Sequence, residues 1–143
     1  MVEQFIVSFF ASAAFGIIFS VPRRLLAACG VVGMIGWGIY TGLSNLRLTS
    51  VPATLLAAFA VTGLSLIAAR LYKAPVTVFS ASGIVPLVPG GLAYDAMRHF
   101  VDNDYNVAVQ LSAKTLMISG AIAMGLILAE VIDQLARRRQ MAP

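Results

Sequence analysis

Apolar residues gather in five long stretches of this chain, and short polar or charged segments separate one stretch from the next. A helix that crosses the hydrocarbon core of a bilayer, about 30 Å thick, needs about 20 mostly apolar residues. The pattern therefore predicts five membrane-spanning helices, at about residues 5–21, 25–43, 51–69, 75–101 and 104–135.

The composition excludes a water-soluble fold. Apolar residues make up 59% of the 143 residues and charged residues only 11%, with a mean hydropathy of +0.89, whereas a soluble domain carries about 25% charged residues. We therefore expect an all-α integral membrane protein with one transmembrane domain over residues 1–143. The basic pair Arg23 and Arg24 follows the first apolar stretch instead of preceding it, so this stretch is predicted to be a retained span and not a cleaved signal peptide.

Basic residues are distributed unevenly between the two ends of the predicted spans. Seven of them follow spans one, three and five, whereas only Arg47 and Arg98 follow spans two and four. Positive charge favours the cytoplasmic side of a membrane, so we expect the N-terminus outside the cell and the C-terminus in the cytoplasm. The seven residues on the predicted cytoplasmic side are Arg23, Arg24, Arg70, Lys73, Arg137, Arg138 and Arg139.

Small residues recur along the second span, which contains Gly30, Gly33, Gly36, Gly38 and Gly42. Small side chains let transmembrane helices approach one another closely. We therefore expect these glycines to mark helix–helix contacts, either within the chain or between copies in a homo-oligomer.

Residues 80–91, inside the fourth span, contain two prolines, Pro86 and Pro89, and three glycines, Gly83, Gly90 and Gly91. Proline has no backbone N–H and clashes with the carbonyl four residues earlier, so a break in the helix is predicted here. Irregular backbone inside a membrane is tolerated where protein buries it or where it lines a wet cavity. Two interpretations stay open: a packed kink without a ligand, and a substrate site between two half-helices.

A broken span brings free carbonyls at one half-helix end close to free N–H groups at the other, and transporters use such ends to hold ions and anionic groups. Under this hypothesis, hydroxyl groups and glycine backbone near the break contact the substrate. The candidate substrate-binding residues are Ser80, Ser82, Gly83, Pro86, Pro89, Gly90, Gly91, Tyr94 and, in the fifth span, Lys114.

Few ionisable residues lie inside the predicted spans. Lys114 either faces a substrate path or extends its long side chain to the outer interface. Asp95 and Arg98 are three residues apart and can pair on a helix, as an ion pair at the outer boundary or as an outer gate. Asp133 and Arg137 are predicted to pair locally at the inner end of the fifth span.

The sequence offers little for enzyme or metal chemistry. It contains a single cysteine, Cys29, and a single histidine, His99, which are too few for a thiolate or imidazole metal cluster. No nucleophile–base motif and no phosphate-binding loop is present in the sequence, so we expect neither an enzyme nor a bound cofactor. The basic tail at residues 137–139 suits anionic lipid head groups better than nucleic acid.

Two motifs carry a resemblance to a known family. The first is Val21-Pro22-Arg23-Arg24 with Gly33-x-x-Gly36 downstream, and the second is Ile84-Val85-Pro86-Leu87-Val88-Pro89-Gly90-Gly91 with Tyr94 and Met97. In order and spacing over nearly the whole chain, this sequence resembles the threonine/serine exporter family, and more closely its small YjjB-type subunit.

The resemblance implies a multi-pass secondary exporter in the bacterial inner membrane. It also implies a partner, a large YjjP-type subunit that supplies the other half of the membrane domain. Members of the family are linked to the export of threonine and serine or of dicarboxylates such as succinate. Two alternatives stay open: a structural subunit that stabilises a membrane complex without touching substrate, and a small homo-oligomeric channel.

Overall fold

The computed structural model describes residues 2–141, and over this range the chain is all-helical, as predicted. Short turns connect the helices, and no strand occurs among the described residues. In chain order the elements are α1 (Val2–Ile18), α2 (Arg23–Asn45), α3 (Ser50–Tyr72), α4 (Val76–Ile84), the short 3-10 helix η1 (Val85–Leu87), α5 (Gly90–Val101) and α6 (Tyr105–Met141).

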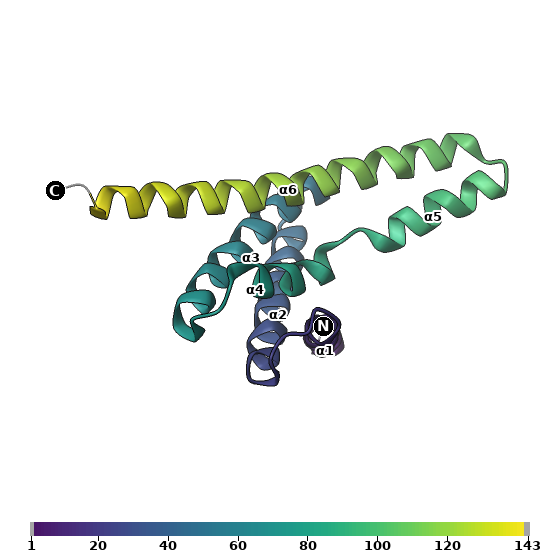
Figure 1. Ribbon diagram of the computed structural model, residues 1–143. Coiled ribbons are helices and arrows are strands. Elements are labelled where there is room, and N and C mark those ends of the chain that lie inside the picture. Colours follow the sequence, from purple (N-terminus) through teal and green to yellow (C-terminus); the bar gives the residue numbers. More distant parts are fainter. Residues whose placement is uncertain (1, 142–143) are drawn as a thin grey trace.

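The helices form a bundle with a projecting arm (Figure 1). Helices α1 to α4 pack together, and α4 contacts both α2 and α3. The long helix α6 packs against α3 along one side of the bundle. Helix α5 runs outward from the bundle and the first part of α6 returns alongside it, so that these two segments form an arm that extends beyond the bundle (Figure 1).

Three helices, α2, α3 and α6, are long and apolar enough to cross a membrane. The segments Val76–Leu87 and Gly90–Val101 pass the same test as a pair bent by 50°, which gives up to four spans. Helix α1 has 17 residues, or about 26 Å at 1.5 Å per residue, and counts as a shorter apolar helix. The structure therefore supports a multi-pass protein, while the fifth span and the orientation stay predictions.

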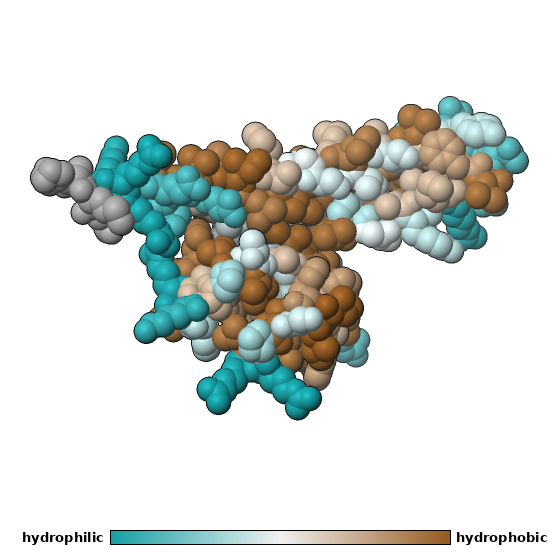
Figure 2. Space-filling model, viewed as in Figure 1, coloured by the Kyte–Doolittle hydropathy of each residue, from teal (hydrophilic) through white to brown (hydrophobic). Residues whose placement is uncertain are grey.

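The surface agrees with a membrane protein. Hydrophilic side chains gather at the far end of α6, at the tip of the α5–α6 arm and at the lower edge of the bundle, with hydrophobic surface between them (Figure 2). Many large apolar side chains are exposed on this surface, including Phe10, Ile18, Leu71 and Leu116. Apolar side chains in such numbers are stable on the outside of a protein only when lipid or another protein covers them.

The helices end where polar residues take up the left-handed backbone conformation. Ser20, Arg47, Lys73 and Asn103 have φ angles of 58°, 63°, 51° and 62° and lie in the turns after α1, α2, α3 and α5. This conformation costs a non-glycine residue about 1–2 kcal/mol, and it turns the chain back on itself. The polar segments that separate the apolar stretches in the sequence are thus the turns of the fold.

Close packing between α1 and α2 depends on the glycines of α2. A Cβ atom added at Gly30 would lie 2.6 Å from the ring of Phe9, and one added at Gly38 would lie 2.8 Å from the ring of Phe5. The predicted helix–helix contacts within the chain are therefore confirmed for these positions. Gly42 differs, because a Cβ there would meet nothing within 4 Å.

Helix α6 is longer than the sequence predicted. It continues without a break to Met141, whereas the apolar pattern placed its end at about residue 135. The reason is that arginine is a good helix former, so the helix persists through residues 137–139 after the apolar stretch has ended. At 37 residues, or about 55 Å, α6 exceeds the hydrocarbon thickness of a bilayer.

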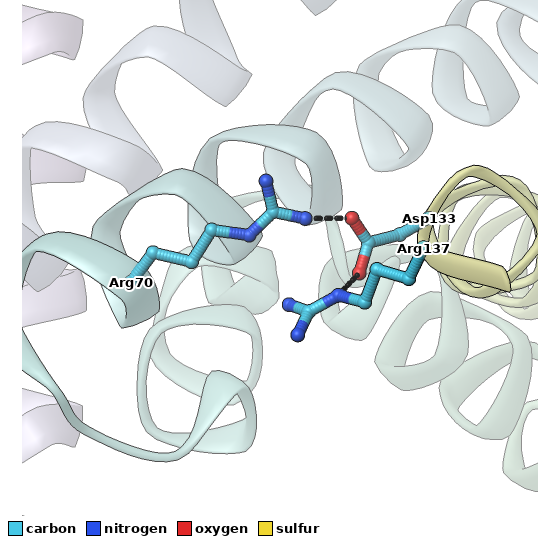
Figure 3. A network of polar contacts seen from close by, with 3 residues as sticks. All are labelled: Arg70, Asp133 and Arg137. Atoms are coloured by element: carbon cyan, nitrogen blue, oxygen red, sulfur yellow. Dashed lines mark hydrogen bonds and ion pairs between the residues drawn. The ribbon is translucent and has the colours of Figure 1, made fainter. Parts of the chain in front are cut away.

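An ion network joins the C-terminal end of α3 to α6 (Figure 3). Asp133 accepts hydrogen bonds from Arg70 of α3 and, at 2.9 Å, from Nε of Arg137 one turn further along α6. The predicted local pair of Asp133 and Arg137 is thus confirmed, and a contact between helices is added to it. The carboxylate is largely buried, with 15% of its side chain exposed, whereas both arginines are about half exposed.

Replacing Asp133 with asparagine should lower the free energy of unfolding by about 1 kcal/mol, because two charge-assisted contacts are lost at a site that is partly screened by water. Chemical unfolding in detergent micelles, followed by circular dichroism, measures the change. Glu130→Gln removes a carboxylate one turn away on the same helix and should cost less than about 0.5 kcal/mol. Equal losses in the two variants would show that the network does not hold α6 to α3.

Candidate functional site

The fourth span is broken at the predicted place. Helix α4 ends at Ile84, η1 continues to Leu87, and α5 begins at Gly90, with a bend of 50° between the two halves. Pro86 lies within η1, and Pro89 directly precedes α5. Because neither proline can donate a backbone hydrogen bond, the regular helical pattern stops between them.

The backbone groups at the break are less free than the sequence suggested. The N–H of Val88 donates to the carbonyl of Val85 at 3.3 Å, and the N–H of Gly90 donates to the carbonyl of Val88 at 2.8 Å. The break was expected to leave backbone carbonyls and N–H groups free for a ligand, but the Val85 carbonyl and the Gly90 N–H are both engaged within the chain.

Gly90 and Gly91 do not use the conformational freedom of glycine. No described glycine has a positive φ angle, and a Cβ added at either position would meet nothing within 4 Å. Both residues are exposed in the first turn of α5. The fold of this chain alone therefore does not require glycine at these two positions, and they leave an open backbone surface next to the break.

The residues of α4 before the break lie inside the bundle. Ser80 and Ser82 are buried, and the Ser82 hydroxyl donates to the carbonyl of Val78 at 2.6 Å. A Cβ added at Gly83 would lie 2.7 Å from a methyl group of Val32 and 3.1 Å from one of Val61. These contacts support tight packing of α4 against α2 and α3, which is what a packed kink requires.

The remaining candidates lie on the α5–α6 arm, away from the buried residues of α4. Tyr94 is 69% exposed, and Lys114 is also exposed on α6. Arg98 lies with its Nε 3.9 Å from Asp102, so the structure pairs it with Asp102, four residues on, instead of with Asp95. The candidates thus divide into a buried group, a group at the break and a group on the arm.

A cavity of about 380 Å³ lies beside the break, between α1, α2 and η1. Pro86 forms one wall and is the broken span's contribution to it. None of the other lining residues was among the candidates from the sequence. The lining consists of Glu3, Gln4, Val7, Ser8, Ala11, Trp37 and Pro86.

Two polar atoms near this cavity have no hydrogen-bond partner among the described residues. They are Nε1 of Trp37, whose residue lines the cavity, and the hydroxyl of Ser12, which lies one turn beyond Ser8 on α1 and is fully buried. A buried polar group without a partner costs about 1–3 kcal/mol, and such groups are uncommon in folded proteins. Of these two residues only Trp37 belongs to the cavity lining, so its N–H is the group that a ligand or water in the cavity would satisfy.

Sequence signals for this cavity existed but were weak. Trp37 is the single tryptophan of the chain, and Ser8 and Ser12 are four residues apart and therefore share one face of the mostly apolar helix α1. Neither signal indicates which other helix they would face. The cavity combines residues from three segments that are far apart in the sequence, which only the fold brings together.

Comparisons with known proteins find one family that covers most of the chain. Residues 4–132 match the family described as "Threonine/Serine exporter, ThrE". An uncharacterized protein of Haemophilus influenzae is 30% identical over 125 residues, which is 82% of this chain and 42% of the relative, so the chain spans less than half the length of this relative. No solved structure matches the chain. Because the family match covers most of the chain, this protein belongs to the threonine/serine exporter family.

Proposed function

We propose that this chain is a membrane subunit of a secondary exporter, with its substrate site beside the broken fourth span. The observation that carries the proposal is the 50° bend between η1 and α5, together with the adjoining cavity that Pro86 of η1 lines. Broken helices with adjoining cavities are where transporters bind their substrates. The candidate cargo is a small amino acid such as threonine or serine, or a dicarboxylate such as succinate.

The proposal includes five spans in the bacterial inner membrane, with the N-terminus outside and the C-terminus in the cytoplasm. Support for the orientation comes from the uneven distribution of basic residues. Support for α1 as the fifth span comes from its close packing on α2 through Gly30 and Gly38, because a helix packed along a span is expected to share its depth in the membrane.

A partner is also part of the proposal. The Haemophilus influenzae relative has more than half of its length outside the match, and a large YjjP-type subunit would supply an equivalent half to this chain. The open surface at Gly90 and Gly91 and the exposed apolar face of the α5–α6 arm are the regions where such a partner, or a second copy of the chain, would contact it.

A second candidate function is that of a structural subunit that touches no substrate. The packing of Ser82 and Gly83 favours it, since these residues of the motif already serve to join α4 to α2 and α3. A homo-oligomeric channel is the third possibility. The three functions predict different results in a transport experiment.

Efflux from proteoliposomes loaded with labelled threonine or labelled succinate tests the proposal. The chain is reconstituted alone and then with the large partner. We expect efflux only from the pair, with a preference for one solute. Efflux by the chain alone, without saturation, would support a channel, and correctly folded preparations that move neither solute would support the structural subunit.

Replacing Gly90 with leucine should leave the fold intact, because an added side chain meets nothing within 4 Å. If substrate passes this open backbone surface, export should fall about tenfold or more, since a bulky side chain would occupy its path. The matched control is Gly120→Leu on α6, where a Cβ also meets nothing within 4 Å. Unchanged export in Gly90→Leu would place the substrate path elsewhere.

A further inference from the structure

We propose that the cavity between α1, α2 and Pro86 binds a small amino acid, with Glu3 holding its ammonium group and Trp37 holding its carboxylate. This inference rests on the proposed function and deepens it, because it names the site and selects between the two substrate classes. Four features of the cavity support it: its size, its polar groups, its charge and its position.

The volume of the cavity is sufficient for a small solute, although volume alone does not select one solute over another. A volume of about 380 Å³ lies near the lower end of the range for ligand pockets, which is about 300–1,000 Å³. An amino acid with a short side chain fills part of this space, and a few waters at about 30 Å³ each fill the rest. Val7 and Ala11 give the wall an apolar part, against which the methyl group of threonine can pack.

The polar groups suit the carboxylate end of an amino acid. The indole N–H of Trp37 can only donate, and it has no hydrogen-bond partner among the residues that the structure describes. Ser8 lines the same cavity and is only 6% exposed, and its hydroxyl can also donate. A ligand oxygen that accepts from the Trp37 N–H would give this buried donor a hydrogen-bond partner.

The charge of the cavity selects the class of ligand. Glu3 is the one ionisable residue in its lining, and none of the lining residues is basic. A zwitterionic amino acid places its ammonium group next to this carboxylate, whereas a dicarboxylate dianion would meet a like charge without a compensating cation. The site is therefore expected to bind threonine or serine and to reject succinate.

The position connects the site to the moving part of the transporter. Glu3 and Ser8 lie on α1, Trp37 lies on α2, and Pro86 lies in η1, directly before the bend of the fourth span. A ligand bound here touches the segment where that span changes direction. Binding and a change in the bend are thus coupled through direct contact at Pro86, which alternating access requires.

The single tryptophan makes the site directly measurable. Trp37 is the only tryptophan in the chain, so its fluorescence reports the state of this cavity. The chain, reconstituted in nanodiscs with its partner where export needs one, is titrated with L-threonine, L-serine and succinate, and the same preparation carrying Trp37→Phe supplies the background. We expect a saturable change in Trp37 emission with threonine and serine and none with succinate.

Substitutions of Glu3 and Trp37 test which residue contacts the ammonium group of the ligand and which contacts its carboxylate. Glu3→Gln keeps the size of the side chain and removes its charge, and it should weaken threonine binding about tenfold, as expected for the loss of one charge-assisted contact. Glu130→Gln, an exposed carboxylate on α6, should leave binding unchanged. Trp37→Phe keeps an aromatic ring and removes the N–H, so the KM for threonine export should rise about tenfold while kcat changes little.

The possible outcomes distinguish a failure of this binding site from a failure of the proposed exporter function. Threonine export without a change in Trp37 emission would leave the exporter standing and overturn the site. A response to succinate and not to threonine would overturn the charge assignment. A saturable response to threonine in a preparation that exports nothing would support the site and overturn the exporter, and the absence of both binding and export would overturn both.

Discussion

Leucine at position 125 is expected to force α6 away from α3 and to destabilise the protein more than any other single change considered for this chain. A Cβ at Gly125 would lie 2.7 Å from the carbonyl oxygen of Leu55, 2.9 Å from Cβ of Ala58 and 3.0 Å from the backbone nitrogen of Phe59. Overpacking a tight interface costs about 1–3 kcal/mol when side chains can adjust. Two of these atoms belong to the backbone of α3, so we expect the loss in the free energy of unfolding to reach about 3 kcal/mol or more.

Unfolding in detergent micelles and the yield of correctly folded protein measure this effect. Gly120→Leu is the matched control, because it adds the same side chain to the same helix at a position where a Cβ meets nothing within 4 Å. It should change the free energy of unfolding by less than about 0.5 kcal/mol. If both variants behave alike, α6 does not pack on α3 through Gly125 in the membrane.

Alanine at position 83 is expected to lower the free energy of unfolding by about 1–2 kcal/mol, because its methyl group would crowd Val32 and Val61. The companion change Val32→Ala removes the nearest methyl group, which lies 2.7 Å from the added Cβ. The double variant should therefore be more stable than the sum of the two single changes predicts, by about 1 kcal/mol.

Export measured in the same three variants tells the two interpretations of Gly83 apart. If the double variant regains both stability and export, Gly83 serves to pack α4 against α2 and α3. If stability returns without export, the glycine has a further role at the site. Additive losses of stability would mean that Gly83 and Val32 are not in contact, which would contradict the packing of the fourth span.

The sequence predicted the bounds of the second and third spans closely, because polar residues flank both of these apolar stretches. The second and third were expected at about residues 25–43 and 51–69, and the helices occupy Arg23–Asn45 and Ser50–Tyr72. In an apolar environment each backbone N–H and C=O must pair within its own helix, so a long apolar stretch forms a helix whatever its neighbours are. The break in the fourth span follows from the chemistry of proline for the same local reason.

Predictions of which residue a given side chain or glycine contacts were less successful. Arg98 pairs with Asp102 and not with Asp95, because more than one acidic residue was within reach and side-chain geometry decides among them. A Cβ added at Gly38 would meet Phe5 of α1, whereas one added at Gly42 would meet nothing within 4 Å, although both glycines belong to one small-residue pattern. Arg70 reaches Asp133 across 63 positions of sequence, and no local pattern indicates such a contact.

The sequence by itself determined that this is a helical membrane protein, where its helices lie and where one of them breaks, because each of these properties depends on the local hydropathy and backbone chemistry of a single segment. The tertiary structure decided which glycines pack, which charges pair and where a cavity lies. Glu3, Ser8, Trp37 and Pro86 line one cavity although they come from three separate segments. Their proximity depends on how α1, α2 and the bent span pack, and the energy of that packing is a property of the assembled bundle and not of any one stretch of the chain.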